Sequence, residues 1–184
     1  MQFPLTPSLS IREVPWSNPV GADLRRAQQA ELDARFGGID HDPAPPTEAD
    51  TAVFVIAYER SSGQPLGCGG LRRLDESTAE VKRIYVLPYA RGSGVATTVL
   101  SALEFRARAA GYGVITAEAG SAQSDGRKFY EHAGYMVVPN FGLYTGLPHS
   151  TCYAKVIEPG LRSTALSTSF PGAGKSRRIS PDAF

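Results

Sequence analysis

Apolar residues recur along the chain in short runs and in period-two alternation, which is the pattern of β-strands. Residues 53–58 (VFVIAY) form a continuous apolar run rich in β-formers and predict a buried strand. Weaker runs bounded by turn residues predict six more strands, at residues 9–14, 66–74, 78–86, 114–118, 135–138 and 152–157.

Three other segments have helical spacing, with Pro or Gly at their ends. Pro19 opens a predicted helix that runs to about residue 36, and two further helices are expected over 94–110 and 125–133. Glycine follows each of them. The order is strand–helix, a three-strand meander, and then alternating helices and strands. This order predicts an α+β or α/β domain with a mixed sheet flanked by helices.

Two segments have no periodicity. Residues 37–52 are rich in Pro, Gly and acidic residues, so they cannot continue a helix or join a central strand. Residues 159–184 are rich in Ser, Thr, Gly, Pro and Ala, with scattered apolar residues. We therefore expect one domain over residues 1–158 and a low-complexity tail over 159–184 that is flexible or loosely docked.

Composition narrows the classes of protein that this chain can represent. Hydrophobic residues make up 42% and charged residues 20%, enough for one core, which excludes a wholly disordered chain. The net charge of +1 gives no electrostatic footprint for nucleic acid or an anionic membrane. No apolar run reaches the ~20 residues that cross a bilayer, and the first residues do not resemble a secretory signal. We expect a cytoplasmic protein without nucleic-acid or membrane partners.

The cysteines and histidines predict no metal site and no disulfide framework. Cys68 and Cys152 are too few for either and are expected to be reduced and buried. The histidines, at positions 41, 132 and 149, share no ligand spacing. His149 lies in the loop before the last predicted strand, where it could border a substrate site, although no pattern in the sequence indicates this.

The most specific chemical signal is the turn over residues 86–96 (VLPYARGSGVA), between a predicted strand and a predicted helix. The first N–H groups of a helix have no internal partner and lie at the positive end of its dipole. Gly92 and Gly94 allow close approach of a phosphate to this backbone, and Arg91 adds a charge. No Lys follows Gly94, and Thr97 replaces the third Gly of a dinucleotide turn, which excludes two common phosphate motifs. The turn alone leaves an ordinary strand-to-helix connection as an equal alternative.

This turn matches R-x-x-G-x-A, and the chain around it resembles the GNAT family of N-acetyltransferases. The stretch AEVKRIYVLPYARGSGVATTVLSALEFRARAAGYGVITAEAG is similar to the family's fourth strand, cofactor turn, third helix and fifth strand. QSDGRKFYEHAGY and FGLYTGLPHSTCYAKVI are similar to its closing helix and final strands. The resemblance covers about residues 9–157. It implies a mixed, mostly antiparallel sheet with a V-shaped opening between strands four and five, which receives the pantetheine arm.

The resemblance implies acetyl transfer from acetyl-CoA to a primary amine of a small molecule or peptide, by direct attack in a ternary complex without a metal. Glu80 matches a glutamate that acts as general base, and Tyr130 matches a tyrosine that protonates the CoA thiolate. A strand glutamate paired with Lys82 or Arg72, and an aromatic residue packed on the sheet, are the respective alternatives. Oligomeric state stays open, although related folds often pair as homodimers.

The resemblance also places the binding residues. Those implied for acetyl-CoA are Ile84, Tyr85, Val86, Arg91, Gly92, Ser93, Gly94, Val95, Ala96 and, as a weaker assignment, Gln123. Glu31, Arg35 and Phe36 lie where the family has acceptor-binding elements. So does the acidic segment with Asp40, Asp42, Glu48 and Asp50, which favours a cationic amine or amino sugar or, alternatively, only solubilises a loop.

Two other functions remain open at this stage. The domain could bind CoA without catalysis, as a regulatory or interaction module, with a degenerate acceptor site. It could instead be a nucleotide-binding enzyme of another class, which predicts that ATP or NAD binds more tightly than CoA.

Overall fold

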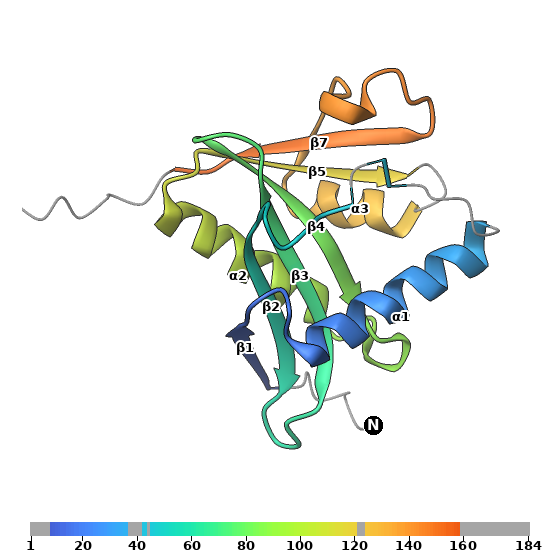
Figure 1. Cartoon of the computed structure of the whole chain (residues 1–184), viewed down its shortest axis with the longest axis vertical. Helices are drawn as coiled ribbons and strands as arrows, with labels where there is room; N and C mark the ends of the chain where they lie inside the picture. Colours follow the sequence, from blue (N-terminus) through green and yellow to red (C-terminus); the bar gives the residue numbers. More distant parts are fainter. Residues whose placement is uncertain (1–7, 37–41, 44, 121–123, 159–184) are drawn as a thin grey trace, which may run out of the picture.

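The computed structural model describes residues 8–36, 42–43, 45–120 and 124–158. The predicted elements all form, with ends within two residues of the expected positions. In chain order the helices and strands are β1 Leu9–Glu13, α1 Pro19–Phe36, β2 Thr51–Glu59, β3 Pro65–Arg73, β4 Thr78–Val86, α2 Val95–Ala110, β5 Val114–Gly120, α3 Ser124–His132, β6 Met136–Val138 and β7 Ser150–Val156 (Figure 1).

The seven strands form one mixed sheet in the order β1-β2-β3-β4-β5-β7-β6. Neighbouring strands are antiparallel except β4 and β5, which are parallel and are joined by a crossover through α2. The expected mixed, mostly antiparallel sheet is confirmed.

Helices cover both faces of the sheet because its central strands are apolar on both sides. In β2, Val55 and Ala57 belong to the cluster that α2 and α3 cover, whereas Phe54 and Ile56 belong to the cluster under α1. This alternation follows from the two-residue period of a strand. Figure 1 shows α1 on one side of the sheet and α2 on the other.

The parallel strands β4 and β5 separate halfway along their length. They pair from Thr78 opposite Val114 to Val81 opposite Ala117, and then pairing ends. Beyond this point β4 continues on β3 and β5 continues on β7, so the two strands diverge (Figure 1). The backbone edge of β4 from Lys82 to Val86 therefore has no strand partner on the β5 side.

Other expectations can be compared with the described residues. No helix among them has the length and apolar character needed to span a membrane. Within the same residues, no group of His, Cys, Asp or Glu side chains is placed to hold a metal ion. Cys68 and Cys152 are free and buried, as predicted. The predicted tail, 159–184, lies outside the described residues, and the domain boundary stays a prediction.

Candidate active site

The glycine turn and the start of α2 have the geometry of an anion-binding site. Gly92 and Gly94 adopt φ of 74° and 84°, the left-handed region that favours glycine, and a Cβ built on either would meet only open space. Gly94 is the N-cap of α2, so the N–H groups of Val95, Ala96 and Thr97 belong to the unpaired first turn of the helix.

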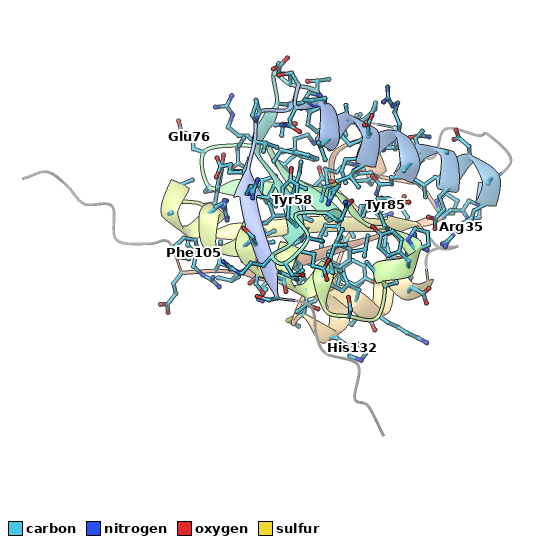
Figure 2. All side chains as sticks on the ribbon, turned by 90° about the horizontal axis from the view of Figure 1, so that it is seen from below. Arg35, Tyr58, Glu76, Tyr85, Phe105 and His132 are labelled. Carbon is cyan, nitrogen blue, oxygen red and sulfur yellow. The ribbon has the colours of Figure 1, made fainter. Side chains whose placement is uncertain are left out.

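A cavity of about 660 Å³ opens in front of this turn. Its lining comes from α1, the end of β4, the turn and α3, and includes Tyr85, Arg91, Gly92, Gly94 and Phe129. Figure 2 shows Tyr85 and Arg35 on the side of the molecule where α1 ends, opposite Glu76 and Phe105. The sequence-predicted turn residues thus border one concave surface, except Ser93, whose hydroxyl donates to the carbonyl of Ala90 at 2.6 Å.

Arg91 is held by a carboxylate on α1. Its guanidinium contacts Glu31 at 2.5 Å and donates to the carbonyl of Val86 at 3.0 Å. Glu31 also pairs with Arg35 at 2.7 Å. The hydrogen bond from Arg91 lowers the pKa of Glu31, with smaller contributions from both arginine charges.

Glu31, Arg35 and Phe36, which are expected to contact the acceptor, lie in the last turns of α1, and that role stays a prediction. Glu31 and Arg35 line the cavity at Arg91, where a diphosphate is expected. Phe36 is the last residue of α1, and its side chain lies outside the described part of the structure.

Sequence reasoning did not find Gln28, a residue of α1 that lines both cavities. Its amide donates to the carbonyl of Ile84 at 3.0 Å, and its Oε1 is buried without a partner among the described residues. Two carbonyls of the β4 segment expected to bind pantetheine, those of Ile84 and Val86, thus accept hydrogen bonds from the chain's own side chains.

A second cavity, of about 170 Å³, lies in the opening between β4 and β5. It shares residues with the first cavity, so the two are contiguous. Shared lining residues are Gln28, Leu32, Ile84, Gly126 and Phe129. Some charged or ionisable residues border the second cavity but not the first. They are Asp42, Lys82, Arg83, Glu118 and Tyr130.

Tyr130 lies at the junction of α3 and the opening. The ring is 7% exposed and packs against Phe129, Tyr135 and Tyr153, with centroids 5.3–5.7 Å away. Burial, with a smaller contribution from nearby carboxylates, raises the pKa of Tyr130 above its ordinary value. The phenol therefore remains protonated at neutral pH, as donation to a thiolate requires.

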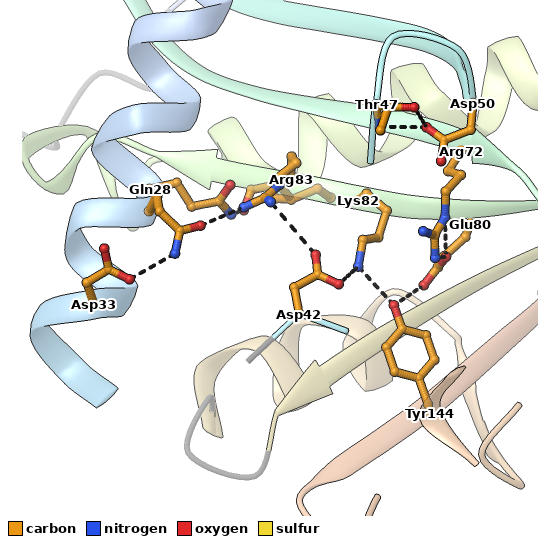
Figure 3. A network of polar contacts seen from close by, with 12 residues as sticks. Gln28, Asp33, Asp42, Thr47, Asp50, Arg72, Glu80, Lys82, Arg83 and Tyr144 are labelled. Carbon is orange, nitrogen blue, oxygen red and sulfur yellow. Dashed lines mark hydrogen bonds and ion pairs between the residues drawn. The ribbon is translucent and has the colours of Figure 1, made fainter. Parts of the chain in front are cut away.

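Glu80 lies in a buried network instead of facing a cavity. It has no exposed surface, pairs with Arg72, and accepts a hydrogen bond from the hydroxyl of Tyr144 at 2.8 Å. The ammonium of Lys82 donates to the same hydroxyl at 2.9 Å (Figure 3). The predicted pairing of this strand glutamate with Arg72 is present, and Glu80 borders neither cavity in the described residues. Its role as general base stays a prediction.

Glu118 is the carboxylate that does border the opening. It follows Ala117, the last β5 residue paired with β4, so it lies where the strands diverge. Desolvation by burial raises its pKa above the ordinary value, partly opposed by a hydrogen bond with Ser150 and the charge of Lys82. One local signal for Glu118 is the two-residue alternation of β5, which puts it on the same face as Thr116.

Two aspartates of the acidic segment are paired within the chain. Asp42 contacts Lys82 at 2.9 Å and Arg83 at 3.8 Å (Figure 3). Asp50 caps a turn by accepting from the N–H of Thr47 at 2.7 Å. Glu48 is exposed, whereas Asp40 and Gln123 lie outside the described residues. The preference of this segment for a cationic acceptor stays a prediction.

Comparisons with known proteins agree with this geometry. A model described as the acetyltransferase (GNAT) family matches residues 11–135. A curated relative, an IAA acetyltransferase of Azospirillum brasilense, is 36% identical over 92 residues, 50% of this chain. The match spans 59% of that relative's own length.

Solved structures share the fold. A Klebsiella pneumoniae protein classed as an acyl-CoA N-acyltransferase is 26% identical, with a TM-score of 0.66 over 80% of this chain and 97% of that one. A GNAT family acetyltransferase from Elizabethkingia anophelis with acetyl-CoA bound is 16% identical, with a TM-score of 0.59 over 81% and 98%.

Proposed function

Because the chain belongs to the acetyltransferase (GNAT) family, we propose that it transfers the acetyl group of acetyl-CoA to a primary amine of a small molecule or peptide. The amine attacks the thioester directly while both substrates are bound, so no covalent enzyme intermediate is needed. The observation that carries the proposal is the contiguity of the cavity at the glycine turn with the cavity between β4 and β5.

In this proposal the glycine turn binds the diphosphate of acetyl-CoA. The N–H groups of residues 92–96 supply hydrogen-bond donors, and Arg91 supplies a full charge, which it must share with Glu31. The pantetheine arm then runs along the unpaired edge of β4, as an added strand would. The thioester reaches the opening where Tyr130 and Glu118 lie.

Attack requires a neutral amine. An alkylammonium group has a pKa of ~10.4, so a base must remove its proton near neutral pH. Glu118 suits this task because it borders the cavity and because burial raises its pKa toward the working pH. Glu80, the base expected from the sequence, reaches the cavity only through Tyr144 and Lys82. We therefore propose Glu118 as the proton acceptor and Glu80 as the group that positions Tyr144 and Lys82.

The remaining steps balance the reaction. The amine nitrogen forms a bond to the acetyl carbon, and the carbon–sulfur bond then breaks. Tyr130 donates its proton to the leaving thiolate, and the second proton of the amine nitrogen, released as the amide forms, replaces it through solvent. Glu118 returns the first proton to solvent. A phenol with a raised pKa remains the acid throughout the pH range in which the amine is partly neutral.

The test combines binding with turnover. Calorimetry should detect acetyl-CoA binding, and Arg91→Gln together with Gly94→Val should abolish it in a protein that stays folded by circular dichroism. Thiol release from acetyl-CoA, followed with a panel of amines, should require both the protein and an amine. Mass spectrometry should then find the acetylated amine.

Two results would contradict the proposal. Tight acetyl-CoA binding with no thiol release from any amine would indicate the alternative, a CoA-binding module without catalysis. Tighter binding of ATP or NAD than of CoA would indicate a nucleotide-binding enzyme of another class.

A further inference from the structure

Two consecutive cationic residues of β4 border the cavity between β4 and β5 and share one carboxylate. The side chains of Lys82 and Arg83 are 9% and 13% exposed. Asp42 reaches the Lys82 ammonium at 2.9 Å and the Arg83 guanidinium at 3.8 Å, and it borders the same cavity (Figure 3). Cations this far from solvent need a negative partner, because an unpaired buried charge is strongly destabilising.

The backbone of β4 is distorted at this place. Consecutive residues of a regular strand point to opposite faces, so Lys82 and Arg83 would ordinarily not meet the same group. Arg83 has φ of 59°, the one non-glycine residue with positive φ in the described ranges. It lies in the register shift between the pairs Cys68–Tyr85 and Gly70–Lys82. A left-handed conformation is unfavourable for arginine, and here the bulge brings two cations to one point.

The charged side chains around the cavity form two subsites of opposite charge. Lys82 and Arg83 form a cationic side, and Glu118 forms an anionic side that is close enough for the Lys82 charge to affect its pKa. The cavity volume of about 170 Å³ is that of roughly five or six waters, so an acceptor held entirely inside it is small.

We propose that Lys82 and Arg83 bind a carboxylate of the acceptor, which makes the acceptor an amino acid with its amine directed to Glu118. Asp42 occupies this subsite when no acceptor is present and leaves it when the acceptor's carboxylate arrives. This inference rests on the proposed function, because it assigns the acceptor class of the same site. The exchange preserves the charge balance: one carboxylate replaces another beside two cations. An amine without a carboxylate has to bind while Asp42 keeps its place.

The first experiment compares amino acids with their own carboxamides as acceptors. The members of a pair differ in the group that Lys82 and Arg83 would bind, and the carboxamide also lowers the pKa of the neighbouring amine, so the comparison is made on KM. We expect the KM of the acid to be at least ~10-fold lower than that of the amide, although more of the amide's amine is neutral. Equal KM values for acid and amide, or a preference for the amide, would overturn the inference while leaving the proposed acetyl transfer intact.

Variants then assign the effect to these side chains. Arg83→Gln should raise the KM of the acid about 10-fold and leave that of the amide unchanged, whereas Arg83→Lys should retain most of the preference. Asp42→Asn should lower the KM of the acid, because it removes the internal competitor. Asp23→Asn is the matched control, since Asp23 lies on α1 outside both cavities and pairs with Arg26. Equal effects of Arg83→Gln on acid and amide would overturn the inference.

A binding measurement keeps the inference testable if no amine is turned over. Calorimetry with N-acetyl amino acids and their amides reports on the anion subsite without catalysis. Selective binding of the acids that Arg83→Gln abolishes would support the subsite even if acetyl transfer failed. Equal binding of acids and amides, or binding of neither, would overturn it.

Discussion

The choice of proton acceptor leads to opposite expectations for two isosteric substitutions, Glu118→Gln and Glu80→Gln. Each removes one negative charge and keeps the side-chain shape. The two carboxylates differ in surroundings: Glu118 borders the cavity, whereas Glu80 is completely buried between Arg72 and Tyr144. We therefore expect Glu80→Gln to lower mainly the stability of the fold and Glu118→Gln to lower mainly the rate of acetyl transfer.

For Glu80→Gln the expected effect is mainly on stability. The Arg72 side chain is only 11% exposed, and the substitution leaves its charge without Glu80. Removing one partner of a buried ion pair costs ~3–5 kcal/mol. Glutamine can still accept from Tyr144, so the lower end, ~3 kcal/mol, applies. At ~2–4 °C per kcal/mol for a chain of this size, the melting temperature should fall by ~6–12 °C.

For Glu118→Gln the expected effect is on rate. Loss of a general base typically costs ~10²–10⁴-fold in turnover. The pKa of Glu118 is higher in the folded than in the unfolded chain, so its ionisation destabilises the fold as pH rises through that interval. Glutamine removes this cost, and the melting temperature at neutral pH should stay the same or rise.

The pH profile identifies the base independently of rate. A base works only when ionised, so the kcat/KM of the wild type should fall at acidic pH with an apparent pKa above the ~4.3 of a free glutamate. In Glu118→Gln this acidic limb should disappear, leaving the dependence set by the acceptor amine. Thiol release at saturating acetyl-CoA, together with thermal melts, measures both properties. Loss of turnover in Glu80→Gln at an unchanged melting temperature, with a wild-type profile in Glu118→Gln, would refute this reasoning and restore Glu80 as the base.

Two further substitutions test the cofactor turn and the proposed acid. Glu31→Gln removes the carboxylate that competes for Arg91, and an exposed pair of this kind contributes ~0.2–1 kcal/mol, so the KM for acetyl-CoA should fall by up to about fivefold. A rise in that KM would show that Glu31 assists binding. Tyr130→Phe should lower kcat by about 10²-fold without changing the KM for acetyl-CoA, whereas Tyr135→Phe, in the same aromatic cluster, should leave kcat unchanged. Equal rates in the two variants would exclude Tyr130 as the acid.

The sequence predicted the regular elements well because their signals are local. Period-two alternation and flanking glycines located every strand and α-helix of the described residues within two residues, but not the short 3-10 helices Pro88–Ala90 and Gly142–Tyr144. The glycine turn was also local, since left-handed residues at 92 and 94 require glycine and the helix follows at once. Fold and cofactor turn were therefore accessible before any coordinates, and the family resemblance supplied the opening between β4 and β5.

The sequence could not predict the acceptor side, because its contacts join segments that are distant along the chain. Glu80 matched a motif, but its burial depends on Tyr144, which is 64 residues away. Asp42 reaches Lys82 across 40 residues from a segment without periodicity. The register of β4 on β5, which aligns Glu80 with Thr116 and leaves Glu118 beyond the last pair, is equally non-local. Burial and strand register decide which carboxylate borders the cavity, and neither can be predicted from a local sequence pattern.

The same arrangement explains why polar residues collect on one half of one sheet face. Leu24 of α1 covers Phe54 and Ile56, but near Glu80 the cover comes from Asp42 and the turn that carries Tyr144. Polar groups on that part of the sheet are therefore paired with loops instead of being excluded by an apolar helix. Loops can change without disturbing the sheet, whereas the glycine turn is fixed by backbone geometry. In the proposed function, binding of acetyl-CoA thus depends on the regular part of the fold, and the choice of acceptor depends on side chains that loops hold in place.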